Sequence, residues 1–218
     1  MLHVIPYKPR AAFLPFHQRT KRWSCLVAHR RAGKTVAAIN DLIRAAVTSK
    51  SEMPLYAYIA PFRSQAKSVA WDYLKHFSAT SAASTNESEL TVDMINGSKV
   101  RLFGADNADS IRGLGFDGMF LDEYGDFKPS VWGNILRPSL SDRQGWCCFG
   151  GTPKGKNQFW DIKQTAERLK NAWFLLELPA SKSGLLPDGE LSAARAQLSK
   201  DQYDQEYEIS FEASILGA

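Results

Sequence analysis

The sequence predicts an α/β fold built on a mostly parallel sheet, with an antiparallel hairpin added to it. Two apolar strand patterns, near residues 24–28 and 56–60, are each followed by a helical pattern, over about 36–47 and 65–77. This alternation is typical of parallel strands joined by crossover helices. Farther along, two alternating runs are joined by Asn96-Gly97, a dipeptide that favours the tight turn of a hairpin.

The other elements follow from the same kinds of pattern. Ser64 is expected to cap the second helix, and the polar tract at 78–88 is predicted to be a loop. The remaining elements are expected in this order: hairpin strands at 90–95 and 99–103, a loop at 104–118, a strand at 118–121, a helix at 128–140, a strand at 146–149, a helix at 157–169, a strand at 173–178, a loop at 179–189, and short helices at 190–198 and 201–210. The more polar tail predicts two parts, a core over 1–180 and a small helical subdomain over 181–218.

The composition indicates a chain that buries a substantial core. Of its 218 residues, 44% are hydrophobic and 23% are charged, and no apolar run approaches the length of a membrane span. The N-terminus lacks the basic and apolar segments of a signal peptide, and Cys25, Cys147 and Cys148 lie in apolar runs that predict buried thiols. We therefore expect a cytoplasmic protein without a membrane partner. The net charge of +4 is compatible with nucleic-acid binding but does not demonstrate it.

The stretch from Ala28 to Thr35 has the pattern of a phosphate-binding loop, the Walker A motif. It follows the first strand, ends in Gly-Lys-Thr and opens the first helix, although Ala28 stands where the usual motif has a glycine. Backbone N–H groups and a helix N-terminus form an anion site in such a loop. Lys34 would reach the β- and γ-phosphates, and the Thr35 hydroxyl would hold Mg²⁺. The residues expected to contact the nucleotide here are Ala28, His29, Arg30, Arg31, Ala32, Gly33, Lys34 and Thr35.

Two acidic residues follow the strand predicted at 118–121, in the manner of a Walker B motif. Asp122 would hold the Mg²⁺ shell, and Glu123 would orient and deprotonate the attacking water. Thr152 ends the next strand and is placed to sense the γ-phosphate, although a lone threonine is a weak signal. Together with the phosphate-binding loop, these residues predict a nucleotide-hydrolysing enzyme.

In this order the motifs resemble the ATPase part of the large terminase subunit of tailed double-stranded DNA bacteriophages. The distinctive pieces are Ser110-Ile111-Arg112-Gly113 shortly before Leu121-Asp122-Glu123, and Gly151-Thr152-Pro153 after them. Gln18 ahead of the loop and the basic residues within it add to the resemblance. It extends over nearly the whole chain and implies a RecA-like, ASCE-type P-loop ATPase fold.

The resemblance also implies a function. Members of the family couple hydrolysis of ATP, with Mg²⁺, to translocation of viral double-stranded DNA into a procapsid in the host bacterial cytoplasm. The implied partners are DNA, other copies of the chain in a ring, the portal protein and the small terminase subunit. By the same resemblance, Gln18 would contact adenine and Thr152 would belong to the motif that couples hydrolysis to movement.

An arginine is needed to neutralise charge in the transition state, and the sequence leaves its identity open. Arg30 or Arg31 could act in cis from the loop, whereas Arg112 matches the position of a trans-acting finger. Arg112 could instead form a structural ion pair with a local aspartate. The aspartates in question are Asp106, Asp109 and Asp117.

Two further expectations concern DNA. Candidate DNA-contacting residues are Lys154, Lys156 and the cluster of Arg19, Lys21 and Arg22. The chain ends, at 214–218, about where the nuclease domain of a large terminase would begin, so no DNA cleavage is expected from it. The alternative function is a helicase- or recombinase-like DNA-dependent ATPase, although a helicase needs a second RecA-like domain for which the tail offers little room.

Overall fold

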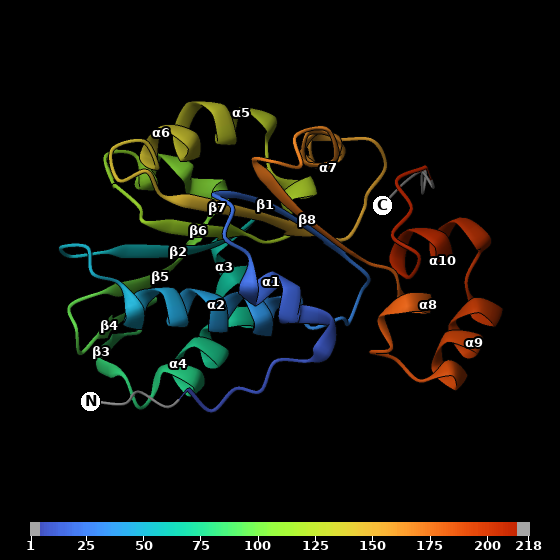
Figure 1. Cartoon of the computed structure of the whole chain (residues 1–218), viewed down its shortest axis with the longest axis horizontal. Coiled ribbons are helices and arrows are strands. Elements are labelled where there is room, and N and C mark those ends of the chain that lie inside the picture. Colours follow the sequence, from blue (N-terminus) through green and yellow to red (C-terminus); the bar gives the residue numbers. More distant parts are fainter. Residues whose placement is uncertain (1–4, 213–218) are drawn as a thin grey trace. The chain divides into compact units, whose positions relative to one another are not determined.

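The computed structural model describes residues 5–212 (Figure 1). The chain divides into two compact units. Among the described residues, the first unit holds 5–9, 35–122 and 126–148. The second holds 10–34, 123–125 and 149–212. The expectation about the end of the chain at 214–218 lies outside the described residues.

The sheet of the first unit is centred on β2 (Leu55–Ala60). It pairs in parallel with β5 (Lys99–Gly104) on one side and with β6 (Gly118–Leu121) on the other. Beyond β5 come β4 (Thr91–Met94) and β3 (Ala82–Asn86), each antiparallel to its neighbour, so the order is β3-β4-β5-β2-β6. The hairpin predicted from its turn is confirmed, and Gly97 has the positive φ, 84°, that such a turn requires.

The tract at 78–88 was wrongly predicted to be a loop, because it contains β3. Four of the five residues of β3 are exposed, so the strand lacks the alternation of apolar side chains that marks a half-buried strand. Backbone pairing with β4, rather than a pattern of buried side chains, makes this segment a strand. Similarly, the loops expected at 104–118 and 179–189 contain short helices, a 3₁₀ turn at Ala105–Ile111 and α8 at Ala180–Ser183.

Helices lie on both faces of this sheet (Figure 1). On one face are α2 (Lys34–Thr48), α3 (Arg63–Ala66) and α4 (Asp72–Ser78), and on the other are α5 (Pro129–Val131) and α6 (Arg137–Ser139). Segments of π-helix at 67–71 and 132–136 join α3 to α4 and α5 to α6.

The predicted cap of the second helix is a further correction. Phe62, in extended conformation, is the N-cap of α3, so Ser64 lies inside the helix rather than at its boundary. The N–H of Arg63 donates to the carboxylate of Asp106 at 3.1 Å. A side chain from elsewhere in the chain therefore satisfies the helix end, and no local capping residue is needed.

In the second unit, β1 (Trp23–Ala28) pairs in parallel with β8 (Trp173–Leu178), and β7 (Trp146–Gly151) contributes its last three residues. The helix α7 (Gln158–Arg168) packs against β1 and β8, and the Asn157 side chain caps it. The remaining helices of this unit are α1 (Leu14–Gln18), α8, α9 (Asp188–Gln197) and α10 (Lys200–Glu206). The small helices predicted for the tail are therefore present.

Burial follows the pattern of a parallel sheet. In both β1 and β2, five consecutive residues are buried, as expected for strands covered on both faces. Cys25 in β1, and Cys147 and Cys148 in β7, are buried, which confirms the prediction for these thiols. Within residues 5–212, none of the helices combines the length and the apolar character that crossing a bilayer requires.

Candidate active site

The loop between β1 and α2 turns sharply because two of its residues adopt left-handed backbone conformations. Arg31 has φ 66° and Gly33 has φ 98°. The guanidinium of Arg10 lies beside this turn and donates to the carbonyl of Ala32 at 3.1 Å. Arg10 was not among the residues predicted for the site, since nothing in the sequence links it to a loop 22 residues away.

Lys34 is buried at the end of this loop, and several oxygens surround its ammonium. Its Nζ lies 2.9 Å from the hydroxyl of Thr152, 3.2 Å from the carbonyl of Ala28 and 3.4 Å from that of His29. The carboxylate of Glu123 lies 3.7 Å away. Thr152 in turn donates its hydroxyl proton to the carbonyl of Ala28 at 3.2 Å. Residues from three separately predicted motifs therefore meet around one ammonium group: Ala28 and Lys34 from the loop, Glu123, and Thr152.

The orientation of the Glu123 side chain depends on an unusual backbone conformation. Its φ of 49° lies in the left-handed region, which costs a non-glycine residue about 1–3 kcal/mol. Its Oε2 accepts a hydrogen bond from the N–H of Thr152 at 3.3 Å, which holds the carboxylate near Lys34. A Cβ on Gly151 would meet the Phe159 ring at 3.2 Å, whereas its distance of 3.6 Å from Oε2 of Glu123 would be an ordinary van der Waals contact. Strain of this kind is typical of residues held for a function.

His29 and Arg30 connect the loop to the C-terminal helices of the second unit. His29 is completely buried, with Nδ1 2.7 Å from the Arg30 carbonyl and Nε2 3.0 Å from the Ser183 hydroxyl. Because a carbonyl only accepts, Nδ1 carries the proton. Burial lowers the pKa of His29, and the nearby positive charge of Lys34 adds to this. Arg30 donates its N–H to the Glu206 carbonyl at 2.9 Å, and its side chain lies 3.6 Å from the Glu206 carboxylate.

Asp122 directly follows β6 in the first unit. It is 4% exposed, and its Oδ2 accepts a hydrogen bond from the hydroxyl of Tyr58. Thr35 belongs to the same unit and directly follows Lys34. A threonine hydroxyl and an aspartate carboxylate are hard oxygen ligands, the donor type that Mg²⁺ prefers, so the residues present fit the ion that the sequence implies.

The other predicted residues lie at the surface of their units. Gln18 is the exposed last residue of α1, and Arg31 is exposed on the loop. Arg112 forms an ion pair with Asp109 at 2.7 Å while 61% of its side chain remains exposed. One of the aspartates foreseen as its partner is therefore the one it contacts.

The candidate DNA-contacting residues make contacts within the chain. Lys156 lies 2.7 Å from the Glu212 carboxylate, and Lys21 donates to the Asn171 carbonyl at 2.5 Å. The guanidinium of Arg19 lies 4.1 Å from the centre of the Phe16 ring, and that of Arg22 lies 4.6 Å from Trp23. Lys154 is exposed.

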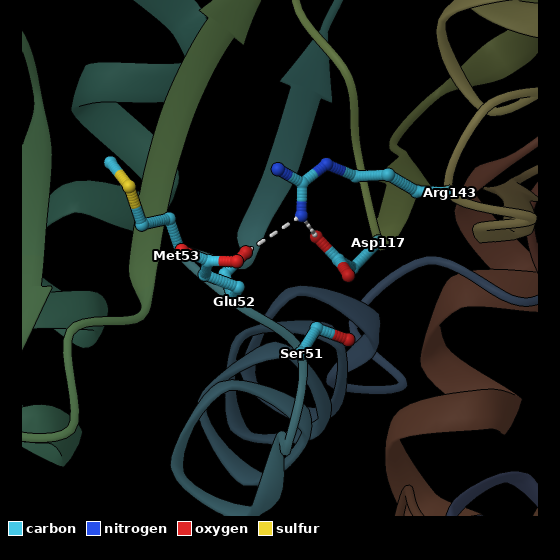
Figure 2. A pocket seen from close by; sticks show the side chains of 5 residues that line it. All are labelled: Ser51, Glu52, Met53, Asp117 and Arg143. Atoms are coloured by element: carbon cyan, nitrogen blue, oxygen red, sulfur yellow. Dashed lines mark hydrogen bonds and ion pairs between the residues drawn. The ribbon is translucent and has the colours of Figure 1, made fainter.

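A surface pocket of the first unit lies at the amino end of β6, the end away from Asp122 (Figure 2). Arg143 bridges it by donating to the Glu52 carbonyl at 3.1 Å and to the Asp117 carboxylate at 3.2 Å. Asp117 directly precedes β6, whereas Asp122 directly follows it. The pocket is thus at the amino end of β6 and is not part of the candidate site. Its lining residues are Ser51, Glu52, Met53, Asp117 and Arg143.

The strand pairings, the helices and the loop after β1 define an α/β protein with the RecA-like fold of P-loop ATPases. The solved ATPase domain of the Thermus phage P74-26 large terminase shares this fold, with a TM-score of 0.80 at 21% identity over 95% of each chain. A large terminase from a second thermophilic bacteriophage, solved in complex with ATP-gamma-S, gives a TM-score of 0.74 at 15% identity over 92% of this chain and 51% of that one.

The sequence itself is similar to a curated large terminase subunit from Thermus phage G20c. The two are 40% identical over 65 residues, which is 30% of this chain and 13% of the relative. The chain thus matches only a small part of that relative's length. No protein-family model matches the chain. The predicted resemblance to large terminases and the predicted fold class are both confirmed.

Proposed function

We propose that this chain is the ATP-hydrolysing motor part of a large terminase, which drives viral double-stranded DNA into a procapsid. The observation that carries the proposal is the meeting of Lys34, Glu123 and Thr152 at strand ends of a fold shared with terminase ATPase domains. A phosphate-binding lysine, a carboxylate for water and a polar sensor are the parts that nucleotide hydrolysis requires. The comparisons do not favour the helicase- or recombinase-like alternative.

The bound nucleotide is ATP in this proposal. Lys34 and the backbone N–H groups of the loop from Ala28 to Thr35 hold the phosphates, and Gln18 contacts the adenine. The second thermophilic phage terminase, which has the same fold, was solved with ATP-gamma-S. Lys34 already lies among oxygens that stabilise its charge. When the γ-phosphate binds, Lys34 would exchange these contacts for contacts with phosphate oxygens.

Mg²⁺ is held by the Thr35 hydroxyl and the Asp122 carboxylate. When bound, the ion neutralises charge on the phosphates and holds their oxygens in place. Thr35 directly follows Lys34 in the chain and Asp122 directly precedes Glu123, so each metal ligand is adjacent in sequence to a residue that acts on the phosphate.

Hydrolysis needs a base for water and a positive charge for the transition state. Glu123 takes the first role, since its carboxylate lies beside Lys34. For the second, Arg30 or Arg31 acts in cis or Arg112 acts on a neighbouring subunit. The exposure of Arg112 favours a role in trans, since only an exposed side chain can reach another copy.

Thr152 couples the state of the nucleotide to the rest of the chain, because its hydroxyl links Lys34 to the end of β1. The partners proposed for the motor are double-stranded DNA, further copies of the chain in a ring, the portal protein and the small terminase subunit. Packaging of this kind takes place in the host bacterial cytoplasm.

A packaging reaction tests the proposal. Procapsids with portal, the small subunit, linear DNA and the chain in its large-subunit context are mixed with ATP, and DNA protected from nuclease is measured. We expect ATP-dependent protection that Lys34→Ala abolishes and that Lys50→Ala, at an exposed lysine after α2, leaves intact. ATP-dependent strand separation without protection would contradict the proposal and support the helicase-like alternative.

A further inference from the structure

Tyr58 is a buried polar residue in the centre of β2. Its side chain has no exposed surface, and in the parallel register of β2 and β6 it stands opposite Phe120. The two rings are stacked, with centroids 6.0 Å apart and planes inclined by 9°. A phenol hydroxyl buried at such a place needs a hydrogen-bond partner.

That partner is the carboxylate of Asp122. Asp122 lies two residues beyond Phe120, so the alternation of side chains along a strand places both on the face that carries Tyr58. The backbone of Asp122 still follows β2, because its N–H donates to the Ile59 carbonyl at 2.8 Å. From the position opposite Phe120, the Tyr58 hydroxyl reaches diagonally and donates to Oδ2 of Asp122. The strand register therefore assigns one carboxylate oxygen to the tyrosine.

We infer that Tyr58 is a positioning residue that orients Asp122 toward the Mg²⁺ of the bound nucleotide. The inference rests on the proposed function. Holding Oδ2 restricts rotation of the carboxylate and fixes the direction in which it faces the metal. A hydrogen bond to an ionised carboxylate is stronger than one between neutral groups. Outer partners of this kind set the orientation of metal ligands and tune the affinity for the ion.

The burial of Asp122 makes this contact important. With 4% of the residue exposed, bulk water cannot substitute for a lost hydrogen bond to the carboxylate. Removal of the Tyr58 hydroxyl would take away the hydrogen bond that holds Oδ2, so metal binding would have to fix that oxygen instead. The ring, stacked on Phe120, would remain in place in a phenylalanine variant.

The experiment measures metal binding directly. Mn²⁺ is titrated into the protein with ATP-gamma-S, and free Mn²⁺ is followed by electron paramagnetic resonance. We expect Tyr58→Phe to raise the Kd for Mn²⁺ by about 10- to 100-fold. Its affinity for ATP-gamma-S in EDTA should equal that of the wild type, because the tyrosine acts only through the metal ligand. An unchanged Kd for Mn²⁺ would overturn the inference.

Tyr56→Phe is the matched control. Tyr56 lies two residues earlier on the same face of β2, is 5% exposed, and packs against Trp146 with ring centroids 6.3 Å apart. It loses the same hydroxyl from the same strand, at the end away from Asp122. We expect wild-type Mn²⁺ binding from this variant. An equal loss in both variants would indicate general loosening of β2 and contradict the inference.

A double variant tests whether Tyr58 acts through Asp122. In an Asp122→Asn background, Tyr58→Phe should add no further loss of Mn²⁺ affinity, because coupled residues are not additive. An additive loss would mean an independent effect and overturn the inference. Failure of the wild-type protein to bind Mn²⁺ with ATP-gamma-S would instead count against the proposed function itself, so the two failures are distinguishable.

Discussion

The ammonium of Lys34 lies 2.9 Å from the hydroxyl of Thr152, although 118 residues separate them in the chain. The same hydroxyl donates to the carbonyl of Ala28, the last residue of β1. Thr152 therefore links the phosphate-binding lysine to the strand that precedes its loop. A shift of Lys34 would therefore also disturb Thr152 and, through it, the carbonyl of Ala28 at the end of β1.

Removing this hydroxyl should affect both stability and turnover. Thr152→Val keeps the shape but leaves the buried Ala28 carbonyl with one donor fewer, so we expect a loss of about 1–3 kcal/mol in the free energy of unfolding. If the loss of this contact to Lys34 also weakens stabilisation of the transition state by about 1–3 kcal/mol, ATP hydrolysis should slow by about 5- to 150-fold. Denaturant unfolding and steady-state hydrolysis measure the two effects. Thr152→Ser should restore both, and Thr165→Val on α7 is the control; a failure of serine to restore either would contradict the role of the hydroxyl.

His29 should make stability depend on pH. Burial lowers its pKa below the ordinary value of 6.5, so the unfolded chain takes up this proton at a higher pH than the folded chain does. The stabilising contribution is complete above pH 6.5 and is lost as pH falls from there toward the lowered pKa, by at most about 1.4 kcal/mol per pH unit. Unfolding free energies between about pH 5 and about pH 7.5 should show this slope in the wild type and not in His29→Asn.

The exposed histidine His76 on α4 provides the control for that measurement. His76→Asn should retain the wild-type slope. If His29→Asn also retains it, the pH dependence arises elsewhere, and burial of His29 does not govern it.

If Arg112 is the arginine that neutralises charge in the transition state, it should act on the site of a neighbouring subunit. Arg112→Ala and Lys34→Ala proteins would each be inactive alone, but a mixed ring contains interfaces in which one subunit supplies Lys34 and its neighbour supplies Arg112. We therefore expect partial recovery of ATP hydrolysis on mixing. The control is Arg44→Ala, which removes an ion pair of the same spacing, Arg44 with Asp41, and should remain active alone. No recovery in rings shown to be assembled would exclude action in trans.

Gln18 should govern the choice of base. A glutamine amide donates and accepts, and this pattern matches the edge of adenine. Gln18→Ala should reduce the preference for ATP over GTP by about 10-fold, the equivalent of one lost hydrogen bond, with little change in stability because the residue is exposed. Competition binding with the two nucleotides measures it. An unchanged preference would remove Gln18 from the adenine site.

The sequence predicted those parts of the fold that local patterns determine. The strand of β6 and the hairpin turn at Asn96-Gly97 were predicted because their signals lie within a few residues. The strand β3 was missed because its exposed serine and threonine residues carry no burial pattern. Only its pairing with β4 identifies it as a strand.

The same distinction applies to the site. Lys34, Glu123 and Thr152 were each predicted from short motifs, and the structure shows that they meet. The hydrogen bond of Tyr58 to Asp122 joins residues 64 positions apart and depends on strand register, which the sequence alone does not provide. Tyr56 and Tyr58 within an otherwise apolar strand were the available signal, and by themselves they indicate only a strand.

The most direct test of the account is ATP hydrolysis in a single turnover by Glu123→Gln, with ATP binding measured separately. Glu123 is held beside Lys34 by a strained backbone and by the N–H of Thr152, and glutamine preserves its shape but cannot accept the proton of water. Glu177→Gln, on β8, is the control. We predict that Glu123→Gln binds ATP as the wild type does and hydrolyses it about 10²- to 10⁴-fold more slowly. Hydrolysis at the wild-type rate would contradict the account.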